Sequence, residues 1–286
     1  MKKILIATDF SANASHAAKY GYGLAKQIKA NVILCNAFIV PAEVPQAGVV
    51  VWPMEDYQSI INESTDELKK LKTELENEYP AGYHPTISLV NEIGTVTGVV
   101  DDAVKSYNVD LIVTGTHGND GLSTFLLGNH SHKMIDAATK PLLLIPPSAS
   151  IEPIKRIAYA TDFKHPQDDL AVIYSLIAFA KMLNAGILLT HVINKAHHSA
   201  SFQKWLDNLL LNLSNKADYP NIHYRIINNN DTEGGLDWLC EHGQIDVLAM
   251  LHRQHNFFHA LLKGSHTKKI ANHISIPLLV FPQTNK

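Results

Sequence analysis

The chain has 286 residues, 46% of them hydrophobic and 18% charged, which is enough for about two domains with substantial cores. Its formal net charge is −3 and it contains no run of lysine or arginine, which argues against a nucleic-acid-binding protein. The apolar run after Met1 is too short for a signal peptide, and no run approaches the ~20 residues of a membrane span. We therefore expect a cytoplasmic protein that has neither a membrane nor a nucleic acid as its partner.

Strand-like and helical segments alternate along the first half. Apolar, β-prone runs predict strands at 3–8, 32–38, 86–90, 111–114 and 142–145. Helical periodicity predicts helices at 11–30, 54–78, 96–107 and 129–139, the first of them capped by Ser11. This alternation is typical of an α/β fold with a parallel sheet and helices on both faces. Ligands of such sheets bind beyond the carboxyl ends of the strands, which would place Asp9, Ala37 and the segment from Thr114 onward on one rim.

The second half repeats the first in the same order. Three sequences recur: KILIATDF (3–10) as RIAYATDF (156–163), DLIV (110–113) as DVLA (246–249), and PLLLIP (141–146) as PLLVFP (277–282). Such a pattern indicates a duplicated domain. The join falls at the short connector 146–150, so we expect domains at 1–147 and 152–286.

A loop with three glycines lies between the strand at 111–114 and the helix that begins at Asn129. Glycines let a backbone approach an anion closely, and the N–H groups of a helix's first turn point toward it. Gly115, Gly118 and Gly128 would line such a cradle. A turn of this kind can also simply connect two elements, so the stretch by itself leaves both interpretations open.

The spacing Gly115-x2-Gly118-x9-Gly128 resembles the G-2x-G-9x-G-(S/T) signature of ATP-binding universal stress proteins. Asn129 stands where that family usually has Ser or Thr, although an asparagine can also cap a helix and donate to a phosphate. Ser131 offers a hydroxyl two residues later. The resemblance extends over both halves. It implies two tandem five-stranded parallel-sheet domains of the adenine-nucleotide alpha hydrolase-like, Rossmann type, packed as an internal pseudo-dimer through 141–145 and 277–281.

The resemblance also implies a site for ATP, ADP or AMP, with or without Mg²⁺. The pair Thr8–Asp9 and Ala37 would contact the ribose and adenine, since a carboxylate accepts hydrogen bonds from hydroxyls and a small residue leaves room for a ring. The phosphates would lie near Thr114, Gly115, His117, Gly118, Gly128, Asn129, His130 and Ser131. Two alternatives stay open: Asp9 could only cap the following helix, and His117 could be an exposed loop residue.

The second half departs from the glycine pattern. Leu251 and Gln254 stand where Gly115 and Gly118 stand, and their side chains would occupy the path of the phosphates. Gly264-Ser265 restores the end of the signature. We therefore expect a nucleotide site in the first domain and a degenerate one in the second, the alternative being that neither half binds a nucleotide.

The sequence offers little for covalent chemistry. It has no GxxxxGK[ST] and no GxSxG, and hydrolysis would also need groups that position water and stabilise the transferred charge. We expect a nucleotide-responsive stress or regulatory protein with no catalytic residues and at most slow ATPase activity. The alternative is a protein- or small-molecule-interaction module that uses the apolar stretch 49–53. Whether the chain also forms a homodimer is open.

The histidines and the cysteines do not indicate a dedicated metal or redox site. The histidine clusters at 130–132, 197–198 and 252–259 match no HExxH pattern, so we expect no dedicated metal site. Cys35 and Cys240 lie in separate apolar patterns and are expected to be buried reduced thiols.

Overall fold

The computed structural model describes residues 2–38, 54–78, 80–116, 129–193, 204, 206–211, 213, 218–252 and 276–282, without the side chains of 54–57 and 129–132. The first half contains β1 (Lys3–Ala7), α1 (Ala12–Ile28), β2 (Asn31–Phe38), α2 (Met54–Glu78), β3 (Ile87–Ile93), α3 (Val96–Tyr107), β4 (Leu111–Gly115), α5 (Asn129–Ala137) and β5 (Leu142–Ile145). The second contains β6 (Arg156–Ala160), α6 (Pro166–Leu183), β7 (Gly186–Ile193), β8 (Ile222–Asn228), α8 (Thr232–His242), β9 (Val247–Leu251) and β10 (Leu278–Phe281).

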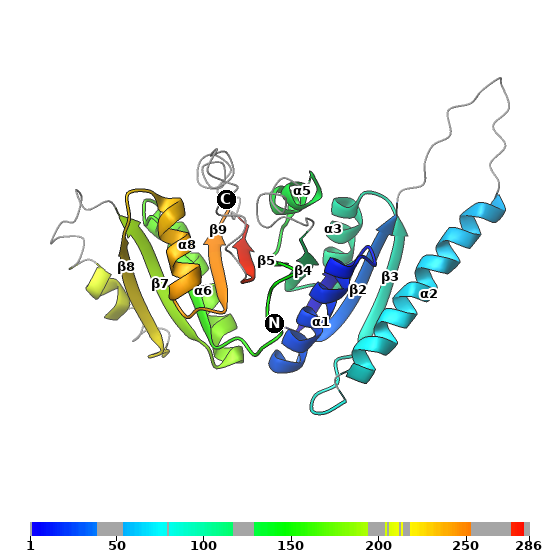
Figure 1. The fold of residues 1–286 in the computed structure, drawn as a ribbon, viewed down its shortest axis with the longest axis horizontal. Helices are drawn as coiled ribbons and strands as arrows, with labels where there is room; N and C mark the ends of the chain where they lie inside the picture. The colour runs from blue at the N-terminus through cyan, green and yellow to red at the C-terminus, as the bar shows by residue number, and fades with distance from the viewer. Residues whose placement is uncertain are drawn as a thin grey trace, which may run out of the picture.

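The strands form one continuous ten-stranded sheet in the order β3-β2-β1-β4-β5-β10-β9-β6-β7-β8. Neighbouring strands within each half run parallel, as the alternation of strands and helices predicted. The two halves lie side by side with their helices packed against the sheet (Figure 1). The predicted fold class, two tandem α/β units in one internal pseudo-dimer, is confirmed.

The halves meet at the antiparallel pair β5–β10. Leu142, Leu143 and Leu144 are in register with Val280, Leu279 and Leu278. All six side chains are at most 4% exposed, so this seam is as dry as a domain core. The predicted association of 141–145 with 277–281 is therefore confirmed.

Small residues bring α1 close to the sheet. Ser11 caps the helix by accepting a hydrogen bond from the Ala14 N–H (3.2 Å), and Lys29 ends it in the left-handed conformation. A Cβ on Gly21 would lie 2.9 Å from Ile6 Cδ1, so the helix can approach β1 only because this residue lacks a side chain. The buried hydrophobic residues form two clusters, and each of them contains residues of both halves.

Matched polar contacts show that the halves are structural repeats. Asp110 Oδ2 accepts hydrogen bonds from the Lys2 and Lys3 N–H groups at 2.6 and 3.2 Å. Asp246 Oδ2 accepts from the Lys155 N–H at 2.7 Å, and also from that of Arg156. Both aspartates thus fix the start of the first strand of their own repeat.

Most predicted bounds are within two residues of those observed, and two larger differences concern β3 and Cys240. β3 continues to Ile93, beyond the predicted end at Val90, because residues 91–93 pair with β2 although Asn91 and Glu92 are polar. Of the two cysteines, which are both free, Cys35 is buried but Cys240 is only partly buried. Burial raises the pKa of each thiol to about 12. Among the described helices, none is both long and apolar enough to cross a membrane.

Candidate functional site

The strand order reverses at β1 in the first repeat. The chain runs from β1 to β2 and β3 on one side, then returns to β4 on the other side of β1. Ala7 is in register with Cys35 of β2 and Thr114 of β4, so the segments after these strands leave the same rim. Such a reversal opens a crevice at the carboxyl ends of the strands, which is where open α/β sheets bind ligands.

The turn after β1 is held by its own side chains. Thr8 is buried, its N–H donates to the Cys35 carbonyl (2.9 Å), and its Oγ1 accepts from the Phe10 N–H (3.0 Å). Phe10 has a φ of 63°, which brings the chain sharply into α1. The Thr8 hydroxyl therefore shapes the turn.

Asp9 is exposed at this rim, and its Oδ1 accepts a hydrogen bond from the Ser11 N–H (3.1 Å). The side chain that caps α1 is that of Ser11. Asp9 therefore closes an Asx turn one step before the helix, with its carboxylate facing solvent at the crevice.

Gly115 ends β4 against the first turn of α1. A Cβ at this position would lie 2.7 Å from the Asn13 carbonyl oxygen, so packing alone requires a glycine here. Asn13 Nδ2 donates to the Thr116 carbonyl (3.0 Å), which ties the two segments together. Thr114, one residue earlier, is half-buried.

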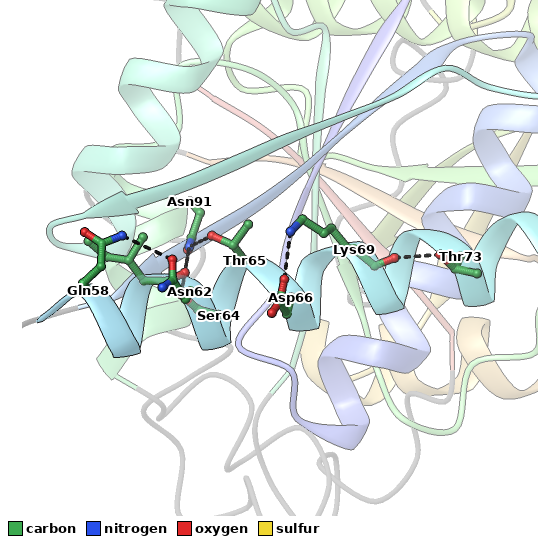
Figure 2. Close-up of polar contacts among 9 residues, drawn as sticks. Gln58, Asn62, Ser64, Thr65, Asp66, Lys69, Thr73 and Asn91 are labelled. Carbon is green, nitrogen blue, oxygen red and sulfur yellow. Dashed lines mark hydrogen bonds and ion pairs between the residues drawn. The ribbon is translucent and has the colours of Figure 1, made fainter. Parts of the chain in front are cut away.

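Ala37 lies half-buried at the end of β2, next to a partly buried polar network. Asn36 Nδ2 donates to Asn91 Oδ1 (3.1 Å). Asn91 Nδ2 donates to Ser64 Oγ (2.8 Å) and Thr65 Oγ1 (2.9 Å) of α2 (Figure 2). These bonds fix α2 against the strand that carries Ala37. Sequence periodicity did not predict this network, since Asn91 lies beyond the predicted end of its strand.

The structure thus brings Thr8, Asp9, Ala37, Thr114 and Gly115 to one rim. His117, Gly118 and Gly128 lie outside the described residues. The backbone of Asn129, His130 and Ser131 forms the first turn of α5, and their side chains are not described.

The second repeat carries larger residues at the corresponding rim. The common register of the strands places Leu251 at the position of Gly115 and Val192 at that of Ala37. Val192 is accommodated because Gly235 of α8 leaves space, and a Cβ there would lie 2.5 Å from Val192 Cγ1. The first repeat has Val99 at the position of Gly235, counted from the helix caps Thr95 and Asp231, so small and large residues have exchanged places.

The second repeat also has a buried carboxylate beneath its rim. Asp169 is 1% exposed, and its Oδ1 accepts hydrogen bonds from the Tyr159 hydroxyl (2.9 Å) and the Thr161 hydroxyl (2.8 Å). The Phe163 N–H donates to Thr161 Oγ1 (3.1 Å), which repeats the turn of the first half. The only sequence signal for this cluster was the acidic pair 168–169 in the first turn of a helix. In the second repeat, the first turn of α6 is thus tied to β6 and to the turn that follows it.

The histidine clusters fall mostly outside the described residues. His252 is described, and its Nε2 lies 3.0 Å from Asp136 Oδ1. Within the described part of the chain, no group of three or more metal-ligating side chains gathers. The apolar stretch 49–53 also lies outside the described residues.

Comparison with known proteins agrees with this arrangement of two repeats. The model of the Universal stress protein family matches residues 1–146 and again residues 153–282. The chain belongs to the universal stress protein family.

Curated members of the family each match about half of the chain. Universal stress protein MJ0531 of Methanocaldococcus jannaschii is 31% identical over 149 residues, covering 50% of this chain and 81% of that protein. A Universal stress protein A homolog of Haemophilus ducreyi is 26% identical over 146 residues, covering 51% and 96%. Each of these relatives thus corresponds to one repeat, and the two matches of the family model give the chain two copies of the domain.

Solved structures show the same tandem fold. A universal stress protein from Archaeoglobus fulgidus has a TM-score of 0.71 at 14% identity, covering 98% of this chain and 96% of that one. A universal stress protein in complex with cAMP covers 50% of this chain at 19% identity, with a TM-score of 0.34. A likeness at that score says nothing about the ligand of the present chain.

Proposed function

We propose that the first repeat of this universal stress protein binds an adenine nucleotide, and that occupancy of this site regulates a stress response in the cytoplasm. The second repeat does not bind a nucleotide in the same way. The protein acts by binding, with at most slow hydrolysis of ATP.

The observation that carries this proposal is the contrast between the two rims. The first repeat has Ala37 and Gly115 beside an exposed Asp9, whereas the second has Val192 and Leu251 at the positions of the first two. An alanine at the carboxyl end of a strand leaves more room for a ring than a valine does, and Gly115 lets the first turn of α1 pack directly against the end of β4. The Asp9 carboxylate is suited to accept hydrogen bonds from ribose hydroxyls or the adenine amine.

The start of α5 supports a phosphate position. Its first turn, from Asn129, follows the segment that leaves the end of β4. A helix N-terminus favours an anion because its N–H groups point outward and its dipole is positive there. Mg²⁺ would then bind between phosphate oxygens of the nucleotide itself.

The test is calorimetric titration with ATP and AMP, with and without Mg²⁺, of the unsubstituted protein and two matched variants. Asp9→Ala removes the rim carboxylate of the first repeat, and Asp162→Ala removes its equivalent, whose Oδ1 accepts from the Lys164 N–H at 3.1 Å. We expect one nucleotide per chain. Asp9→Ala should weaken binding about tenfold or more, as for a charged hydrogen bond, while Asp162→Ala leaves it unchanged.

Three results would contradict the proposal. Binding that depends on Asp162 would place the site in the second repeat, and two equal sites would remove the contrast between the rims. Absence of binding by the unsubstituted protein would favour an interaction module. Multiple turnovers of labelled ATP, abolished by Gly118→Val, would instead make the protein an enzyme.

A further inference from the structure

One side-chain contact joins the last turn of α5 in the first repeat to the second repeat. His252 Nε2 lies 3.0 Å from Asp136 Oδ1. The His252 side chain is 12% exposed and that of Asp136 is 71% exposed, so the histidine is the fixed, buried partner. The bond requires a proton on Nε2, which the ring donates to the carboxylate.

The sheet holds His252 in place. Its N–H donates to the Phe281 carbonyl of β10 (2.8 Å), and it directly follows β9. By register it occupies the position that Thr116 has in the first repeat, immediately after the residue that replaces Gly115. The degenerate rim of the second repeat therefore supplies a side chain that points to the first repeat.

The apolar face of α5 belongs to a hydrophobic cluster that includes residues of both repeats. Met134 and Ile135 are buried in the same hydrophobic cluster as Leu278 and Val280 of β10. The helix thus lies beside the central strands at the seam (Figure 1). Asp136 follows these two residues directly, on the polar side that reaches His252.

Because α5 is short, a contact that fixes one of its ends also limits the motion of the other end. α5 has nine residues, and Asp136 is seven residues from Asn129, or about 10 Å at 1.5 Å per residue. Backbone hydrogen bonds make these turns move together. A bond that fixes the last turn therefore also restricts the first turn, where the proposed nucleotide's phosphates would lie.

We propose that His252 is a positioning residue for the nucleotide site of the first repeat, acting on α5 through Asp136. This inference rests on the proposed function. It gives the second repeat a role that does not require a ligand of its own: the second repeat holds one wall of the first repeat's site.

The experiment compares three substitutions in the full chain. His252→Phe keeps a ring but loses the donor, His252→Gln keeps an N–H donor, and His223→Phe changes an exposed histidine of β8 far from α5. Backbone hydrogen exchange of α5 is measured without nucleotide, and ATP affinity is measured by calorimetry. Thermal unfolding of each variant checks that the fold is unchanged.

We expect His252→Phe to speed exchange in α5 and to weaken ATP binding by about two- to fivefold, as for a partly exposed contact with a carboxylate. His252→Gln should restore both properties, and His223→Phe should change neither. Adding Asp136→Ala to His252→Phe should have no further effect on affinity, because both substitutions remove the same bond.

Two outcomes overturn the inference. Either α5 exchanges at its original rate in His252→Phe, or it loosens while ATP affinity stays the same. Absence of ATP binding by the unsubstituted protein is a separate result. It rejects the proposed function and the positioning role with it, while the exchange data still decide whether His252 holds α5.

Discussion

Individual residues show how two copies of one sequence have diverged while keeping the same turn. Thr8 and Thr161 each accept a hydrogen bond from the N–H two residues later, and Phe10 and Phe163 have φ values of 63° and 53°. Around this shared turn, side-chain sizes differ between the repeats. A turn fixed by local bonds tolerates such changes because it does not depend on what lies in the crevice above it.

The glycines of α1 give a prediction at this scale. A Cβ on Gly23 would meet only Ile151 Cγ2, at 3.8 Å, next to an open cavity of about 240 Å³. Gly23→Ala should therefore raise the free energy of unfolding by about 0.5–1 kcal/mol, the difference in helix propensity. Chemical denaturation measures the change.

Gly21 is the matched control in the same helix. Its Cβ would lie 2.9 Å from Ile6 Cδ1 and 3.3 Å from Val113 Cγ1, and both neighbours are fully buried. Gly21→Ala should lower the free energy of unfolding by about 1 kcal/mol or more, as for an overpacked core. If the two substitutions change the free energy of unfolding equally, close packing of Gly21 against the sheet does not matter for stability.

Whole elements were predicted well where their pattern is strong. The bounds of α2, α3 and β5 agree with the sequence prediction, because long amphipathic stripes and continuous apolar runs identify them. β3 was predicted too short, since Asn91 and Glu92 look like loop residues. Only the pairing with β2 and the bonds to α2 show that Asn91, which is half-buried, belongs to the strand.

The network around Asn91 gives a prediction for the attachment of α2. Asn91→Ala removes the partner of Asn36, which is 5% exposed, and leaves that amide buried without its acceptor. The free energy of unfolding should fall by about 1–3 kcal/mol. The exposed Asn62 of the same helix, bonded only to Gln58 at 3.2 Å in the described structure, serves as control (Figure 2).

Asn62→Ala should change stability by less than about 0.5 kcal/mol, as for most surface sites. Denaturant unfolding measures the free energy of unfolding of both variants. If Asn91→Ala is no more harmful than Asn62→Ala, the network does not hold α2 to the sheet.

At the scale of the molecule, the sequence predicted the duplication, the parallel sheets and the pairing of 141–145 with 277–281. It also placed Asp9, Ala37 and Gly115 on one rim. It did not predict the exchange of Ala37 and Val99 for Val192 and Gly235, because this requires knowing which residues face each other across different elements. The contact of His252 with Asp136 joins positions 116 residues apart, and no local pattern reports it.

The continuous sheet gives the last prediction: the two repeats unfold together. Both hydrophobic clusters contain residues of each repeat, and the seam residues are at most 4% exposed. Leu68 of α2 is fully buried in the first repeat, and α2 packs against β3, the strand of that repeat farthest from the seam. Leu68→Ala should cost about 2–5 kcal/mol of stability.

If unfolding is one cooperative transition, slowly exchanging amides of β6 and β7 lose the same protection as those of β1 and β2. Protection lost only in β1 and β2 would mean that the seam, although dry, does not couple the repeats, and that each repeat is stable without the other.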